Sequence, residues 1–200
     1  MTNEQYYSLI QPYQDASQIL LTRLEMLNHN LYNQEADPIH TIQNRIKEKK
    51  SIEKKLERLN SKGGVEDART LLADIAGIRI ICYFVRDILN LITALKKQSD
   101  LVLIKERDYI SSPKPNGYRS YHIVFGVPVY YMEKKEYYPV EIQLRTMSMD
   151  FWASMEHRIC YKNDKNNTLE LRSAFCQYSK ELQGMEDSFE AYSEMYGNIQ

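Results

Sequence analysis

Hydrophobic positions along the chain follow two patterns, one helical and one typical of buried strands. Over residues 9–31, apolar residues recur at spacings of three and four, which predicts an amphipathic helix. Asp37-Pro38 marks a break after this helix. Short apolar runs follow, and they predict strands at residues 78–84, 101–105, 121–129 and 137–144.

Helical patterns return between and after these strands. They predict helices at residues 87–97, 147–161 and 169–196, with a polar loop at 163–168. The last two strands are expected to pair through a turn at 132–136. This order predicts an α/β (mixed α+β) fold, in which a mixed sheet of about five strands is flanked by helices. We expect one domain over residues 1–200, with a helical extension at 1–37, a core at 38–162 and a C-terminal helix at 163–200.

Composition restricts the class of protein. The chain has 200 residues, 43% of them hydrophobic and 26% charged, which is typical of one globular domain. Its net charge is -1, so no overall positive field attracts nucleic acid, and any anion-binding site must be a local basic patch. No apolar run approaches the ~18 residues that span a bilayer, and the N-terminus does not resemble a signal peptide. Because the three cysteines are scattered, we expect a reducing, cytoplasmic location.

The most charged segment covers residues 45–58, with seven basic and three acidic residues. On a helix at about 100° per residue, several cations and a hydroxyl would share one face. These residues are Lys47, Ser51, Lys54, Lys55 and Arg58. Two interpretations stay open. The segment is a solvated helix face with Glu–Lys pairs, or its cations bind successive phosphates of a polyphosphate.

The last predicted strand, 137–144, alternates apolar and polar residues. Its polar face carries a carboxylate, an amide and a guanidinium in line, from Glu141, Gln143 and Arg145. An ordinary half-exposed antiparallel strand would show the same alternation. The alternative is an organised polar floor of a binding site, because the other face must pack against the core.

Two polar residues accompany the first apolar strand. Arg79 lies in a run that is otherwise apolar, so its guanidinium needs a partner or a ligand. An ion pair between Asp74 and Arg79 is the simplest structural interpretation. Alternatively, Asp74 and Glu141 lie at the ends of neighbouring strands and bind Mg²⁺, which prefers a few hard oxygens together with water and phosphates.

The most specific local signal is the segment Lys114-Pro-Asn-Gly-Tyr-Arg-Ser-Tyr-His122. Pro113 and Pro115 stiffen the approach to it, and Gly117 permits a positive φ or a close backbone approach. The ring of Tyr118 offers a flat face on which a nucleobase can stack. Polar contacts around it would come from Lys114, Asn116, Arg119 and Ser120. A decorated hairpin turn is the alternative.

Two other patterns suggest no chemistry. His157 and Cys160 have a spacing that could bind zinc on a helix, but no second pair with ligand spacing accompanies them. The last twenty residues contain five acidic residues and no Lys or Arg. That composition predicts a solvated or subunit-facing helix.

Five motifs, in order, resemble the synthetase domain of the RelA/SpoT family, and more closely its stand-alone small alarmone synthetases of the RelP/RelQ type. They are Arg45-Ile-Lys47…Ser51…Lys55…Arg58, Asp74-Ile-Ala-Gly-Ile-Arg79, Asp108-Tyr-Ile…His122, Glu141-Ile-Gln-Leu-Arg-Thr146 and Met149-Asp-Phe-Trp-Ala-Ser-Met-Glu-His157. The resemblance covers about residues 38–162. The intact Lys-Pro-Asn-Gly-Tyr sequence favours the RelP branch.

The resemblance implies a GTP/GDP pyrophosphokinase of the stringent response. Such an enzyme transfers the β,γ-pyrophosphate of ATP to the 3′-hydroxyl of GDP or GTP (or GMP), releases AMP and makes (p)ppGpp. By the same resemblance, Asp74 and Glu141 would bind Mg²⁺ (or Mn²⁺), and Glu141 would also accept or orient the hydroxyl proton. The residues implied to bind ATP are Arg45, Lys47, Ser51, Lys55, Arg58 and Arg79.

The resemblance also implies how the acceptor nucleotide is bound. Tyr118 would stack on guanine, and the other contacts would come from Lys114, Asn116, Gly117, Ser120, His122, Gln143 and Arg145. A homotetramer is implied as well. No His is followed by Asp, so we expect no hydrolase site of the His-Asp type, and 200 residues leave no room for the regulatory domains of long family members.

Two alternative functions stay open. The first is pyrophosphate transfer to the 3′ end of tRNA, which the net charge of -1 disfavours because RNA binding relies on phosphate contacts. The second is a non-catalytic nucleotide or RNA sensor on the same fold. The presence of both Asp74 and Glu141 argues against a sensor.

Overall fold

A five-stranded mixed sheet forms the centre of the computed structural model, which describes residues 1–31, 37–61, 63–161 and 169–196. Its strands are β1 (Ile39–Ile46), β2 (Ala76–Cys82), β3 (Val102–Asp108), β4 (Tyr121–Tyr131) and β5 (Lys134–Thr146). Their order in the sheet is β1-β2-β5-β4-β3, in which β2 and β5 are parallel and the other neighbours are antiparallel. The predicted mixed sheet is confirmed.

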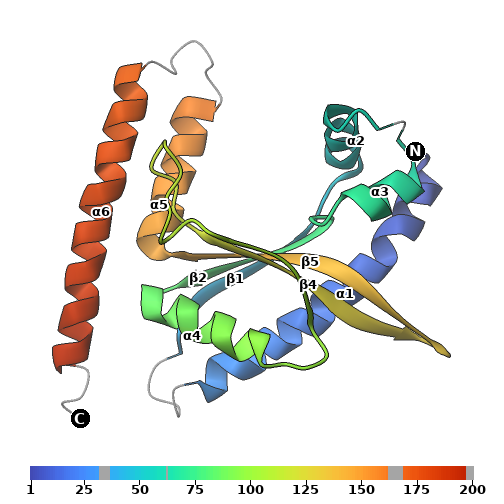
Figure 1. Cartoon of the computed structure of the whole chain (residues 1–200), viewed down its shortest axis with the longest axis horizontal. Helices are drawn as coiled ribbons and strands as arrows, with labels where there is room; N and C mark the ends of the chain where they lie inside the picture. The colour runs from blue at the N-terminus through green and yellow to red at the C-terminus, as the bar shows by residue number, and fades with distance from the viewer. Residues whose placement is uncertain (32–36, 62, 162–168, 197–200) are drawn as a thin grey trace.

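Helices cover the sheet on both faces and at one end (Figure 1). They are α1 (Asn3–Asn30), α2 (Lys49–Arg58), α3 (Val65–Leu71), α4 (Val85–Lys96), α5 (Met147–Glu156), the π-helical turn η1 (His157–Tyr161) and α6 (Leu169–Tyr196). α1 and α4 lie on one side of the sheet, and α2 and α5 rise from the other (Figure 1). The predicted polar loop at 163–168 falls outside the described residues. Within the described ranges, no helix is both long and apolar enough to span a bilayer.

The hydrophobic core lies between the sheet and the two helices α1 and α4. Alternate residues of the central strands are fully buried there, among them Ile78, Ile80 and Ile142. They pack with the apolar stripe of α1, including Leu20 and Leu24. Burying each such side chain contributes about 1.5–3 kcal/mol, so this face of the sheet is fixed against the core. The opposite face is left for polar side chains.

The charged segment 45–58 is not one helix, and our prediction is wrong there. Its first residues belong to β1, in which Arg45 pairs with Gly77, and the pairing continues as the Lys47 amide donates to the Ile75 carbonyl over 2.8 Å. The helix α2 begins only at Lys49. β1 is an edge strand with mostly polar, partly exposed positions, so its sequence lacks the apolar run by which the other strands were predicted. The short helix α3 was not predicted either.

We had expected the acidic residues of α6 to be solvated or subunit-facing, and this does not hold for all of them. Glu186, Glu190 and Glu194 are spaced by four residues and share one face of the helix. Glu186 is buried and paired with Arg119, whereas Glu190 and Glu194 lie near Arg86 at the start of α4. This acidic face therefore attaches α6 to the rest of the domain.

Candidate active site

The polar face of the sheet carries two rows of cross-strand neighbours. One row contains Gln43, Arg79, Gln143 and His122, and the adjacent row contains Arg45, Gly77 and Glu141. Because side chains alternate along a strand, all of these residues share the face opposite the core. The structure thus confirms the polar face predicted for β5 and extends it over β1, β2 and β4.

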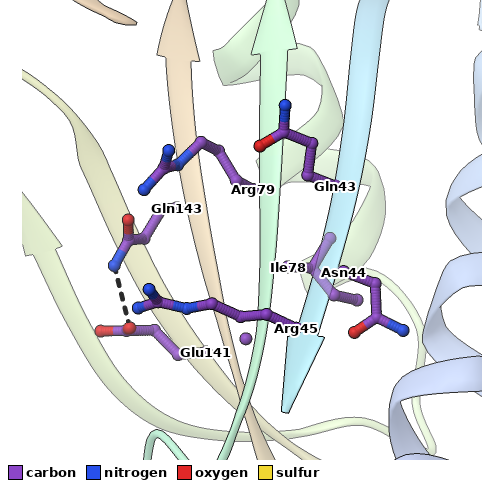
Figure 2. A pocket seen from close by; sticks show the side chains of 8 residues that line it. Gln43, Asn44, Arg45, Ile78, Arg79, Glu141 and Gln143 are labelled. Carbon is purple, nitrogen blue, oxygen red and sulfur yellow. Dashed lines mark hydrogen bonds between the residues drawn. The ribbon is translucent and has the colours of Figure 1, made fainter. Parts of the chain in front are cut away.

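Gly77 allows the Arg45 side chain to lie across β2. A Cβ atom at position 77 would be 3.6 Å from Arg45 Nε and 3.9 Å from the Glu141 carbonyl oxygen, so a larger side chain would occupy this space. Figure 2 shows Arg45 extending from β1 over β2 toward Glu141 of β5. A pocket of about 130 Å³ lies here, and Arg79 and Gln143 also line it.

Glu141 is held by its neighbours on the sheet. The Gln143 amide donates to Glu141 Oε2 over 3.0 Å, and His122 Nδ1 lies 3.6 Å from Oε1. Burial by itself would raise the pKa of Glu141, but the hydrogen bond and charge of His122 and the bond from Gln143 outweigh it and lower that pKa. Glu141 is therefore an ionised carboxylate at neutral pH.

Asp74 precedes β2 and forms ion pairs with two lysines. Lys47 Nζ and Lys55 Nζ both donate to Asp74 Oδ2, over 2.5 and 2.6 Å. Burial alone would raise the pKa of Asp74, yet these two hydrogen bonds bring it below its usual value. The prediction of an Asp74–Arg79 ion pair is wrong. The fold instead brings Lys47, which directly follows β1, and Lys55 of α2 to Asp74.

The two carboxylates fit a divalent cation. Asp74 lies just before β2, and Glu141 is opposite Gly77 on the parallel neighbour β5. The negative charge of Asp74 acts to raise the pKa of Glu141, so the two groups are close enough to repel. Asp74 Oδ1 is buried and accepts no hydrogen bond from the described residues, which leaves it available to a metal. Since the described residues form no group of three or more acidic, His or Cys side chains that could hold a metal, the remaining ligands would be water or phosphate.

Three guanidinium groups meet beside these carboxylates. Burial lowers the pKa of Arg79, and the charges of Arg145 and Arg45 lower it further, against the opposing charge of Asp150. Arg145 donates to Asp150 Oδ1 over 2.9 Å, whereas Arg79 Nη1 lies 3.9 Å from the same oxygen. One carboxylate thus balances only part of this positive charge, and an anionic ligand would relieve the repulsion. Asp150 lies on α5, and we had not predicted its role.

A second pocket, of about 410 Å³, opens between these arginines and the C-terminal end of α5. The three arginines and Tyr118 line it, together with Ala153, Ser154, Glu156 and His157. His157, which we had considered only as a zinc ligand, is among them. The two pockets share Arg45 and Arg79, so they are neighbouring parts of one site.

Tyr118 lies at the edge of this second pocket. Its hydroxyl is 2.8 Å from His122 Nε2 and accepts a hydrogen bond from Arg145 Nη2 over 3.0 Å. Lys114 Nζ lies 4.7 Å from the ring centres of both Tyr118 and Tyr109. Sequence reasoning missed Tyr109, although it directly follows Asp108 in one of the motifs. The structure thus brings together four residues that the sequence assigned to the acceptor nucleotide: Lys114, Tyr118, His122 and Arg145.

The segment 114–118 forms a tight turn. The Gly117 amide donates to the Lys114 carbonyl over 2.8 Å, and the Lys114 amide donates to the Tyr118 carbonyl over 3.1 Å. The Asn116 side chain accepts from the Tyr118 amide and donates to Glu156 Oε1, which joins the turn to α5. Gly117 has φ +91°, a conformation that glycine adopts without strain.

Some predicted site residues lie elsewhere. Ser120 is fully buried, and its hydroxyl donates to the Leu144 carbonyl over 3.0 Å, so the structure gives it a structural contact instead of the predicted contact with a base. Gly117 is buried against α6. Ser51 and Arg58 lie exposed on α2, one before and one after Lys55, which pairs with Asp74.

Comparison with known proteins identifies the family. The region found in RelA/SpoT proteins matches residues 44–166, which is more than half of the chain. The chain belongs to the RelA/SpoT family. It is 46% identical over 142 residues to the GTP pyrophosphokinase YwaC of Bacillus subtilis, covering 69% of this chain and 68% of that protein. It is 33% identical over 202 residues to the GTP pyrophosphokinase YjbM of the same organism, covering 100% and 92%.

Solved structures of small alarmone synthetases have the same fold. Small alarmone synthetase 1 of Bacillus subtilis, bound to its product pppGpp, matches with a TM-score of 0.82 and 32% identity, covering 99% of this chain and all of that one. Small alarmone synthetase 2 of that organism matches with a TM-score of 0.80 and 37% identity, covering 92% and 96%. The resemblance to small alarmone synthetases is confirmed, whereas assignment to the RelP branch stays a prediction.

Proposed function

We propose that this protein is a (p)ppGpp synthetase, which transfers the β,γ-pyrophosphate of ATP to the 3′-hydroxyl of GDP or GTP and releases AMP. The observation that carries this proposal is the meeting of two carboxylates with a cluster of cations on one face of the sheet. The names of YwaC and YjbM support it, as does the pppGpp bound to small alarmone synthetase 1. These relatives give no support to the tRNA-modifying or sensor alternatives.

The donor side of the site, formed by β1, β2 and α2, would bind ATP. Lys47, Lys55 and Arg45 surround the carboxylates, and we assign the ATP phosphates to them, with Ser51 and Arg58 of α2 as further contacts. Arg45 and Arg79 would also flank the adenine. Phosphoryl transfer depends chiefly on in-line positioning and neutralised charge, and these cations provide both.

Asp74 and Glu141 would hold Mg²⁺, or Mn²⁺ in its place. Asp74 Oδ1 is the buried oxygen without a hydrogen bond among the described residues, and Glu141 is ionised. When bound, such a cation neutralises phosphate charge and favours ionisation of a coordinated hydroxyl. The two lysines on Asp74 Oδ2 keep this carboxylate charged and oriented.

Glu141 would also contact the 3′-hydroxyl of the acceptor. Its lowered pKa makes it a weak base, so we assign it the task of orienting the hydroxyl and accepting its hydrogen bond. His122, 3.6 Å from the same carboxylate, and Gln143 keep Glu141 in place.

The acceptor side would bind GDP or GTP. We call residues 109–120 the acceptor loop. Tyr118 would stack on guanine, with Lys114 and Asn116 at the edge of the base, and Arg145 would lie near the acceptor phosphates. A base stacked on an aromatic side chain gains on the order of 1–3 kcal/mol.

The product assay tests this proposal directly. Purified protein is incubated with Mg-ATP and, separately, with GMP, GDP or GTP, and the nucleotides are separated by chromatography. We expect AMP and a guanosine 3′-diphosphate product in equal amounts, and the panel identifies the preferred acceptor. Absence of both products from all three mixtures would contradict the proposal.

We also propose that the protein assembles into a homotetramer through α5 and α6. Large apolar side chains lie exposed along these helices, at Phe151, Met185, Phe189, Tyr192 and Tyr196. Exposed apolar patches of this kind commonly mark protein–protein contacts, and a second copy of this chain would cover them. Light scattering should give the mass of four chains, and Phe189→Glu should reduce it.

A further inference from the structure

α6 contacts the acceptor loop from the side opposite the nucleotide pockets. Arg119 directly follows Tyr118, but its side chain is 5% exposed and Nη1 donates to Glu186 Oε2 over 3.1 Å. Glu186 is 6% exposed. These residues are 67 positions apart, so this contact depends entirely on how α6 packs. The sequence suggested instead that Arg119 would edge a base.

The Arg119–Glu186 ion pair is costly to bury. Arg119 Nε and Glu186 Oε1 are also buried and have no hydrogen-bond partner among the described residues. Desolvation of such a pair often cancels its attraction, so it gives little net stability. Removing one partner, however, leaves an uncompensated charge inside the protein. The pair therefore fixes the relative position of two segments more than it stabilises the fold.

A second contact lies two residues earlier in the loop. Ser179 Oγ donates to the Gly117 carbonyl over 2.6 Å. A Cβ atom at position 117 would lie 3.0 Å from Ser179 Cβ and 3.1 Å from Cys176 Cα. The loop backbone thus rests directly on α6, with no room for a side chain between them.

These two contacts flank Tyr118 in the sequence. Gly117 and Arg119 face α6, whereas the Tyr118 ring lies at the pocket with His122 and Arg145. A third contact supports the same helix from α5, since Trp152 Nε1 donates to the Phe175 carbonyl over 2.7 Å. The two residues on either side of Tyr118 are thus held by α6, while its ring faces the pocket.

We propose that Glu186 and Ser179 are positioning residues for the acceptor nucleotide, acting through Arg119 and Gly117 on Tyr118. This inference rests on the proposed function, because it assigns Tyr118 to the acceptor base. The proposal predicts different effects on the binding of the two substrates. Among the described residues, the hydrogen bonds and ion pairs of Lys47, Lys55 and Asp74 involve no residue of α6. Loss of the α6 contacts should weaken acceptor binding and leave ATP binding unchanged.

Steady-state kinetics of Glu186→Gln and Ser179→Ala test this proposal. We expect Glu186→Gln to raise the KM for GDP by about 10- to 100-fold, as for loss of a hydrogen bond between charged groups, and Ser179→Ala to raise it less. The KM for ATP should stay that of the wild type. Glu194→Gln is the matched control, because this residue lies on the same face of α6 but pairs with Arg86. It should behave as the wild type.

Hydrogen exchange of the nucleotide-free protein gives a readout that needs no turnover. Amides of residues 114–120 should exchange faster in Glu186→Gln than in Glu194→Gln, while amides of β2 and β5 are unchanged. If the wild type makes no product, the proposed function fails, and this measurement still tests the α6 contact. Unchanged loop exchange and an unchanged KM for GDP in both α6 variants would overturn the inference. An equal rise in both KM values would do so too, because it would indicate a general structural role.

Discussion

The donor and acceptor sides of the site use charge in opposite ways. On the donor side, Lys55 of the Lys55–Asp74 pair is 40% exposed, so a phosphate can reach its ammonium group. On the acceptor side, the Arg119–Glu186 pair is about 5% exposed on both partners and does not face the pockets. Accessible charges can exchange their partner for a ligand, whereas buried charges keep theirs. We therefore expect the donor side to bind ligands with its charges, and the acceptor side to use its buried pair to hold the acceptor loop.

Replacing Glu141 with Gln should have the largest effect, because it removes a charge that both sides share. We expect product formation to fall by at least about 100-fold, as when a group that stabilises the transition state is lost. The measurement is AMP release with saturating ATP and GDP. Glu136→Gln is the control, since Glu136 lies at the exposed end of the same strand. Wild-type rates in Glu141→Gln would place the reacting atoms elsewhere.

Lys55→Ala should weaken the donor side selectively. Asp74 keeps its hydrogen bond from Lys47, so the fold should tolerate the change. We expect the KM for ATP to rise about tenfold, the usual cost of one charge-assisted contact, with little change in the KM for GDP. Lys50→Ala, an exposed position on the same helix, is the control. A rise only in the KM for GDP would contradict the division into two sides.

Gly117→Ala should weaken the acceptor side. Alanine would have to adopt φ +91°, a conformation unfavourable for residues other than glycine. Its Cβ atom would also lie only 3.1 Å from Cys176 Cα on α6. Such strain costs about 1–3 kcal/mol, so the KM for GDP should rise and thermal stability should fall. Gly184→Ala is the matched control, because a Cβ atom there meets nothing within 4 Å and alanine favours a helix. If both variants behave alike, close packing at Gly117 has no role.

The pH dependence of stability should show the smallest effect. Because the pKa of Asp74 is lowered in the folded protein, its ion pairs contribute fully above the ordinary value of 3.8 and are lost as pH falls through the lowered value. The difference in melting temperature between the wild type and Asp74→Asn should therefore shrink as the pH falls below about 4. A difference that grows in acid would contradict the sign of this shift.

Local patterns were sufficient to predict much of the site. Strict alternation on β5 predicted that Glu141, Gln143 and Arg145 share a face, since strand geometry fixes this whatever the partner. The breakers around Gly117 likewise predicted an irregular loop that presents Tyr118. The segment 45–58 was misassigned because β1 is stabilised by pairing with β2, a contact that no local pattern records.

The sequence by itself determined four of the five strands, the two carboxylates and the family, because residue types and spacings at motif length carry this information. Only the tertiary structure decided which partners the charges find. Asp74 pairs with Lys47 and Lys55 instead of Arg79, Arg79 and Arg145 approach Asp150, and Arg119 turns away from the pocket to Glu186. Such choices depend on strand register and on helix packing between residues as many as 67 positions apart, where a charge pairs with whichever opposite charge the fold brings nearest.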